Sequence, residues 1–197
     1  MNFNSFVFLL FFLVVFCFYW YVFNKNSKAQ NSVLLFSGLL FYFIADWRFI
    51  LLLILSGFLN FFVAKLNFNK KEFQIRKYFF YFAILFNVGI LLYFKYFNFF
   101  VESFVYLLSC FGINGNVTLF HILLPLGISF FTFQMIGYQI DVNNDEIEPT
   151  NNLLDFFTYL FYFPKLLSGP IERVQHFIPQ IRVKRDFNYK FAVDGLR

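Results

Sequence analysis

The segment FNSFVFLLFFLVVFCFYWYVF occupies residues 3–23 and contains no charged residue, proline or glycine. An α-helix rises about 1.5 Å per residue, and about 20 apolar residues cross the hydrocarbon core of a bilayer. No basic residue precedes the segment, and it ends in aromatic rather than small residues, unlike a secretory signal peptide. We therefore predict a retained membrane helix at 3–23.

The composition extends this prediction to the rest of the chain. Phe accounts for 38 of the 197 residues and charged residues for only 14%, whereas about a quarter of an ordinary globular domain is charged. We expect one membrane domain over 1–197, an all-α polytopic transmembrane helical bundle with about five or six membrane segments. The predicted segments are 3–23, 33–45, 49–64, 78–111, 119–140 and 153–167.

Short polar interruptions suggest how several of these segments end or bend. Asp46-Trp47-Arg48 predicts a turn at the membrane interface, although one long bent helix is an alternative. Segment 78–111 is long enough for a bent helix or two helices. Segment 153–167 is short and contains Asp155, Pro164 and Lys165, so we expect a re-entrant or broken helix there.

Lys95, Asn98 and Glu102 lie at helical spacing within segment 78–111. On one helix face they could pair with one another or line a wet cavity. Alternatively, Lys95 extends to an interface and Glu102 begins a separate interfacial helix. Both interpretations predict a bend.

The basic residues predict the orientation of the chain. The net charge is +5, and the most basic connector runs from Lys65 to Lys77. Lys and Arg accumulate in cytoplasmic loops, so we place this connector and the Lys25/Lys28 loop inside and the N-terminus outside, in a bacterial cytoplasmic (inner) membrane. Membrane orientation and the anionic headgroups of the lipid bilayer account for the basic residues in these short connectors. We therefore expect the lipid bilayer as a partner and no nucleic acid.

The stretch LPLGISFFTFQMIGYQIDV at 124–142 has one polar helix face. Gln134, Tyr138 and Asp141 lie at positions i, i+4 and i+7. This stripe could supply hydrogen bonds at the packing centre of a bundle, where the small residues Gly127 and Gly137 would let helices approach closely. It could equally line a substrate tunnel.

A second notable stretch, YFPKLLSGPIERVQHFIPQI, occupies 162–181. Gly169 and Pro170 predict a turn directly after an apolar segment. Arg173 could hold an anionic group such as a phosphate, or could pair with Glu172 or with lipid headgroups.

These two stretches, together with LLYFKYFNFF at 91–100, resemble the membrane-bound O-acyltransferase (MBOAT) family, and most closely its bacterial alginate O-acetyltransferase branch. The resemblance implies transfer of an acyl group from acetyl-CoA or another acyl thioester, with no bound cofactor, to an exported cell-surface polysaccharide. A periplasmic or extracellular acetyl-transfer partner protein could be the acceptor. The family resemblance also gives six candidates for motif residues or for residues that line a substrate tunnel. These are Gln134, Tyr138, Asp141, Gly169, Pro170 and Arg173.

Two alternatives remain open at this point. One is D-alanyl transfer to teichoic acid within the same family. The other is a non-enzymatic transporter or channel subunit, with Lys95, Glu102 and Asp141 along its pathway.

The resemblance also implies a membrane-embedded histidine base, and the family places that residue downstream of the Gly-Pro-Ile block, beyond Arg197. His121 and His176 match no family position for the base, and no cluster has the spacing of metal ligands. We therefore expect no catalytic residue and no metal site in this chain. We expect the N-terminal portion of an acyltransferase, as a fragment or truncated product that is inactive alone.

The orientation can be tested by cysteine labelling in a background without Cys17 and Cys110. A membrane-impermeant maleimide should label Asn4→Cys in intact cells and should label Asn69→Cys only after the membrane is opened, because Asn69 lies in the basic connector. Labelling of Asn69→Cys in intact cells would contradict the orientation.

Overall fold

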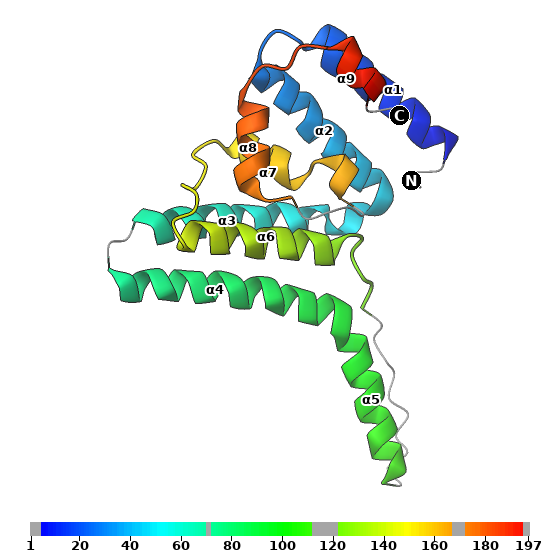
Figure 1. Cartoon of the computed structure of the whole chain (residues 1–197). Helices are drawn as coiled ribbons and strands as arrows, with labels where there is room; N and C mark the ends of the chain where they lie inside the picture. Colours follow the sequence, from blue (N-terminus) through cyan, green and yellow to red (C-terminus); the bar gives the residue numbers. More distant parts are fainter. Residues whose placement is uncertain (1–4, 70–71, 112–121, 167–171, 195–197) are drawn as a thin grey trace.

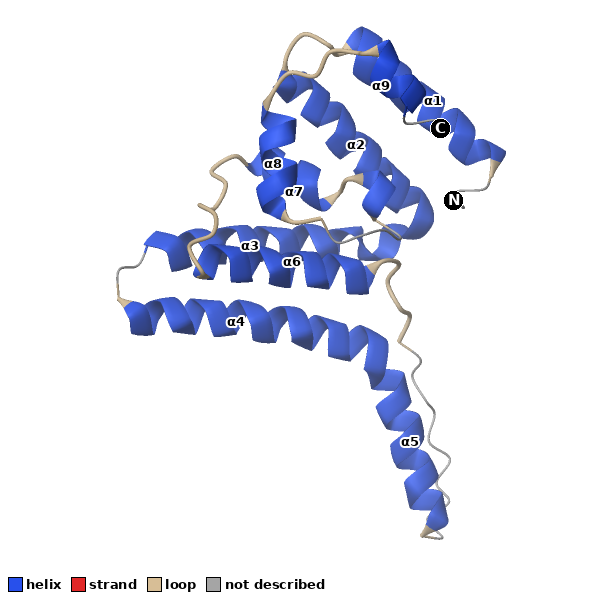
Figure 2. Ribbon diagram, in the orientation of Figure 1, coloured by secondary structure: helices blue, strands red, loops and turns tan. Residues whose placement is uncertain are grey.

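The computed structural model describes residues 5–69, 72–111, 122–166 and 172–194, and every regular element in these ranges is helical (Figure 2). Two continuous helical stretches, Ser27–Asn69 and Phe73–Cys110, are long and apolar enough to cross a membrane. The described part of the chain is therefore all-α, and a membrane helical bundle is consistent with it.

The elements follow the chain in a simple order. The first half contains α1 (Phe6–Cys17), η1 (Phe18–Val22), α2 (Ser27–Asp46), η2 (Trp47–Phe49), α3 (Ile50–Asn69), α4 (Phe73–Leu91), η3 (Leu92–Tyr96) and α5 (Phe97–Cys110). The second half contains α6 (Ile128–Asn143), α7 (Leu153–Leu160), η4 (Phe163–Lys165), α8 (Val174–Arg182) and α9 (Tyr189–Asp194).

Helices α3, α4 and α6 lie side by side (Figure 1) and are joined by buried amides. Asn87 Nδ2 donates to Asn60 Oδ1 at 2.7 Å, and Asn60 Nδ2 donates back to Asn87 Oδ1 at 3.2 Å. Gln139 Nε2 donates to the backbone carbonyl of Asn60 at 2.8 Å. These hydrogen bonds hold the helices together where apolar contact alone gives little preference over lipid.

Apart from α5 and α9, the remaining helices lie around α2 (Figure 1), and α1, α7 and α8 each contact it. Gly38 of α2 lies directly against the backbone of Phe161, which follows α7. An added Cβ at Gly38 would stand 1.7 Å from the Phe161 carbonyl oxygen, so only glycine permits this approach.

Three helix starts differ from the predicted segments. α2 begins at Ser27 rather than near 33, because Asn26 Oδ1 accepts from the Ala29 N–H and caps the helix. α4 begins at Phe73 rather than near 78. α6 begins at Ile128 rather than near 119, since Gly127 adopts a left-handed conformation with φ of 71°.

The polar interruptions noted in the sequence correspond to a short turn, a bend and a short helix. A short 3₁₀ turn, η2, separates α2 from α3, and Arg48 Nε pairs with Asp46 Oδ1 at 2.9 Å. The π-helical η3 lies at the bend between α4 and α5 (Figure 1). With eight residues, α7 is only about 12 Å long.

The proposed polar face of segment 78–111 does not line a pathway with Asp141. α5 extends away from the other helices (Figure 1), whereas Asp141 lies near the opposite end of α6. Asn98 instead holds the backbone of Ile122 through two hydrogen bonds, of 2.8 and 2.9 Å. Lys95 lies over the ring of Tyr96.

The contact at Gly38 predicts a sharp difference between two helical glycines. Gly38→Ala should lower the free energy of unfolding by about 1–3 kcal/mol, because the added methyl group meets backbone that cannot move aside. Gly137→Ala is the matched control: nothing lies within 4 Å of its added Cβ, so it should be neutral or slightly stabilising. Denaturant titration in detergent micelles measures both, and equal effects would contradict the packing described here.

Candidate functional site

The polar stripe on α6 faces α7 and α8 rather than open surface. Gln134 Nε2 donates to the backbone carbonyl of Tyr159 in α7 at 2.9 Å. Tyr138 is 1% exposed and packs against the ring of Phe156, with 5.2 Å between centroids. Asp141 is 6% exposed. All three therefore lie against protein.

Tyr138 borders a small cavity of about 200 Å³ between α6, α8 and the acidic loop 144–150. Its buried hydroxyl has no hydrogen-bond partner among the described residues, although the backbone of Thr150 is close enough to interact with it electrostatically. Gln175 and Arg182 line the same cavity. A hydroxyl held this way can donate to, or accept from, a polar group entering the cavity.

Asp141 lies at the end of α6, where the chain turns into the acidic loop. Its backbone carbonyl accepts from the Glu146 N–H at 2.9 Å, which closes that turn. Burial raises the pKa of the Asp141 carboxyl, and Glu146 raises it further, while Arg173 acts in the opposite direction. Asp141 is therefore a carboxyl whose charge depends on its neighbours.

Arg173 is exposed at the start of α8 and pairs with the acidic loop, not with Glu172 as the sequence allowed. Its Nη1 lies 3.5 Å from Glu146 Oε2, and Gln175 Nε2 donates to the same oxygen at 2.6 Å. Glu172 instead pairs with Lys165 at 2.6 Å. Gly169 and Pro170 lie outside the described residues.

The Lys165 ammonium group is enclosed by aromatic rings as well as by Glu172. Its Nζ lies 3.7 Å from the ring centroid of Phe177, 5.3 Å from that of Tyr162 and 5.6 Å from that of Tyr159. The cation interacts favourably with these ring faces. This arrangement fixes the broken segment after α7 against α8.

A larger polar cleft of about 420 Å³ lies between the start of α2, the start of α7 and the end of α8. Its lining residues are Ser27, Lys28, Glu148, Pro149, Asn151, Asn152, Asp155 and Arg182. Glu148 and Arg182 also line the cavity at Tyr138, so the two spaces share a wall.

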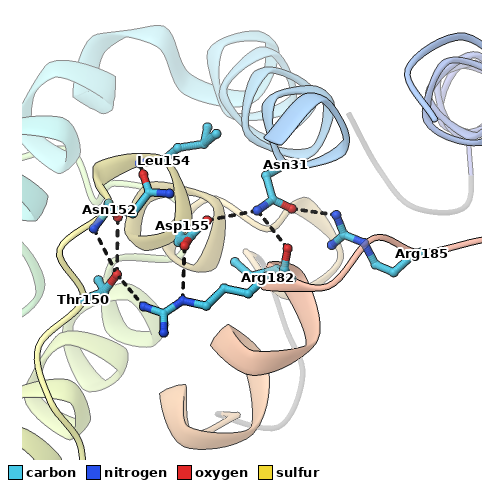
Figure 3. Close-up of polar contacts among 8 residues, drawn as sticks. Asn31, Thr150, Asn152, Leu154, Asp155, Arg182 and Arg185 are labelled. Atoms are coloured by element: carbon cyan, nitrogen blue, oxygen red, sulfur yellow. Dashed lines mark hydrogen bonds and ion pairs between the residues drawn. The ribbon is translucent and has the colours of Figure 1, made fainter. Parts of the chain in front are cut away.

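Figure 3 shows the hydrogen bonds that support one wall of this cleft, at Asp155 and Arg182. Asn31 Nδ2 donates to Asp155 Oδ1 and to the Ile181 carbonyl, both at 3.0 Å. Arg182 donates from Nε to Asp155 Oδ2 at 3.4 Å and from Nη2 to Thr150 Oγ1 at 3.3 Å. Arg185 Nη2 donates to Asn31 Oδ1 at 2.7 Å.

Arg185 is held from a second side by Gln30, which is fully buried. Gln30 donates to the backbone carbonyl of Arg185 at 2.6 Å and accepts from its backbone N–H at 3.0 Å. Burial lowers the pKa of Arg185, but the ordinary value of an arginine is so high that the group stays charged.

Most of this wall was not identified from the sequence. Asn31 fell in a region predicted as a loop, and Thr150, Arg182 and Arg185 fell in polar stretches without a distinctive spacing. One signal was present: Asp155 is a charge inside an apolar run, and such a charge has to find a partner. His176 is exposed on α8, His121 lies outside the described residues, and the described residues contain no cluster that could hold a metal ion.

Known proteins resemble the chain over nearly its whole length. The "Probable alginate O-acetylase AlgI" of Pseudomonas aeruginosa is 34% identical over 195 residues, which is 98% of this chain and 36% of that protein. A protein of the same name from Azotobacter vinelandii is 33% identical over 202 residues, 98% of this chain and 38% of its own length. The chain belongs to the membrane-bound O-acyltransferase family, in its alginate O-acetylase branch.

Other members of this O-acyltransferase family match less closely. The "Peptidoglycan O-acetyltransferase" of Helicobacter pylori is 26% identical over 198 residues, covering 87% of this chain and 37% of its own length. The "Teichoic acid D-alanyltransferase" of Lacticaseibacillus rhamnosus is 36% identical over 53 residues, 27% of this chain and 13% of that protein. The chain spans well under half the length of these relatives. No family model and no solved structure matches it.

The wall of the cleft gives a stability prediction. In Asp155→Asn, an amide with a single accepting oxygen replaces a carboxylate that serves both Asn31 and Arg182, so one donor loses its partner. The free energy of unfolding should fall by about 1–3 kcal/mol.

Asp145→Asn is the matched control for this substitution. Its side chain is 60% exposed in the ion pair with Arg76 at 2.9 Å, so the change should stay within about 1 kcal/mol. Denaturant midpoints in detergent micelles compare the two variants, and an unchanged midpoint for Asp155→Asn would show that the network does not stabilise the fold.

Proposed function

We propose that this chain forms the N-terminal part of a membrane O-acyltransferase that acetylates an exported cell-surface polysaccharide. The supporting observation is the match to alginate O-acetylases over 98% of the chain. The donor in this proposal is acetyl-CoA or another acyl thioester, and a periplasmic or extracellular acetyl-transfer protein is the intermediate or final acceptor.

The proposed location is the bacterial inner membrane, with about five or six membrane segments and the N-terminus outside. The contacts at one end of the bundle support this orientation. Arg76, in the basic connector region, pairs with Asp145 of the acidic loop, and Lys28 lines the polar cleft with Glu148 of the same loop. One predicted cytoplasmic loop thus contacts the acidic loop, and the other borders the same cleft as that loop.

The polar cleft lies at this same end, which in the proposed orientation faces the cytoplasm. Acyl thioesters are made there, so a donor would meet Lys28 and Arg182 first. The cavity at Tyr138 shares Arg182 and Glu148 with the cleft and leads toward the α6 stripe. In this proposal the stripe helps to form the donor side of the site.

D-alanyl transfer to teichoic acid is the second candidate, because a D-alanyltransferase matches part of the chain. The two reactions share the acyl-transfer chemistry and differ in the group transferred. A donor carrying labelled acetyl and a donor carrying labelled D-alanine distinguish them directly.

This prediction compares acetyl transfer by the chain alone with transfer by the chain coexpressed with the remaining part of a relative. Membranes of a host without its own enzyme should transfer no labelled acetyl to surface glycan when they contain the 197-residue chain alone. The family resemblance implies a histidine base outside these 197 residues, and such proton transfer contributes roughly 10²- to 10⁴-fold. Coexpression with the part of the Pseudomonas aeruginosa relative beyond the matched region should restore transfer.

Two controls make this outcome specific. Coexpression with the same part carrying alanine at its catalytic histidine should stay inactive. Transfer by the chain alone that disappears in His176→Ala or His121→Ala would place the base within these residues and overturn the proposal. Transfer of D-alanine instead of acetyl would favour the second candidate.

A further inference from the structure

An apolar groove of about 380 Å³ runs between α1 and α2. Its lining residues are Phe11, Val14, Val15, Phe18, Phe23, Ser32, Val33, Phe36, Ser37 and Leu40. At one end the helices meet through Phe8 and Phe11, whose rings lie 6.1 and 6.0 Å from that of Phe41. Toward the other end, the groove lies between the two helices.

The groove offers no free polar group to a ligand. Ser37 Oγ donates to the Leu34 carbonyl, and Ser32 Oγ donates to the Lys28 carbonyl, both at 2.9 Å and both within α2. Empty cavities lined in this way stay dry, because water needs several polar partners. The groove therefore fits a hydrocarbon chain and not a sugar or a nucleotide.

The rings of Phe18 and Phe23 line one end of the groove, and two lysines follow closely in the sequence. Phe18 and Phe23 stack at 6.1 Å between centroids across the π-helical segment η1. Lys25 lies in the turn that follows, and Lys28, Ser32 and Phe36 succeed one another at i+4 spacing on one side of α2. Both lysines are exposed, and neither makes an ion pair among the described residues.

We propose that the groove between α1 and α2 binds an acyl chain of an anionic membrane phospholipid, with its headgroup phosphate at Lys25 and Lys28. The proposal is independent of the acyl-transfer reaction. An anionic lipid gains about 1 kcal/mol for each basic residue near the membrane surface. Lys28 also borders the polar cleft beside Glu148 and Asp155, so Lys25 contributes most of the selectivity.

Native mass spectrometry of the chain released from nanodiscs tests the proposal. The nanodiscs contain equal amounts of phosphatidylglycerol and phosphatidylcholine. The wild-type chain should retain one phosphatidylglycerol in preference to phosphatidylcholine. Lys25→Gln/Lys28→Gln should reduce this preference roughly 5- to 30-fold, the lower limit being the contribution of Lys25 alone. Lys77→Gln, an exposed lysine on α4, should leave it unchanged.

Filling the groove should have a different effect from removing the charges. Ser37→Phe should abolish retention of both lipids, whereas Leu51→Phe, an exposed position on α3, should not. If circular dichroism shows that Ser37→Phe does not fold, Val14→Phe at the exposed rim decides the question, because it alters no buried contact.

Four results would overturn the proposal. These are equal retention of the two lipids by the wild-type chain, an unchanged preference in the double lysine variant, full retention in a folded groove-filled variant, and a second copy of the chain bound in place of lipid.

Discussion

Asn31 lies in the second turn of α2, and its side chain contacts three other segments. It donates to Asp155 in α7 and to the last turn of α8, and it accepts from Arg185 in the segment beyond α8. An amide that is 1% exposed has to find its partners within the protein. Because those partners are distant in the sequence, α2 reaches its observed position only when α7, α8 and the following segment are also in place.

The same constraint operates in the layer of α3, α4 and α6. Apolar surfaces alone give helices in a bilayer little reason to prefer each other over lipid. Asn60, Asn87 and Gln139 supply a directional contact among these three helices, and Gly38 permits a close approach of α2 to the chain after α7. Polar pairing and small residues therefore decide which helices meet, while the many Phe side chains fill the space between them.

The irregular backbone after α7 is tolerated because protein groups surround it. Gln134 donates to the Tyr159 carbonyl, the Tyr159 hydroxyl donates to the Glu172 carbonyl, and the ammonium group of Lys165 lies among aromatic rings. Backbone of this kind at membrane depth occurs only where protein or water satisfies it. Of these residues, Gln134 and Lys165 belong to the two blocks that carry the family resemblance. The blocks therefore have a structural role in addition to any contact with substrate.

Length and composition were enough to predict an all-helical chain with long apolar helices, since both depend on local periodicity and on the thickness of a bilayer. The position of the α6 stripe on one helix face also followed from spacing alone. The start of α6 did not, because it depends on Gly127 adopting a left-handed conformation beside the backbone of Leu166.

Contacts between distant segments were decided only by the tertiary structure. Glu172 pairs with Lys165 rather than with its neighbour Arg173, and Gly38 rather than Gly137 lies at a close backbone contact. The polar cleft combines residues from α2, α7 and α8, none of which has a distinctive local spacing. A sequence determines which face of a helix a residue occupies, but the partner opposite that face depends on how the whole chain satisfies its buried polar groups.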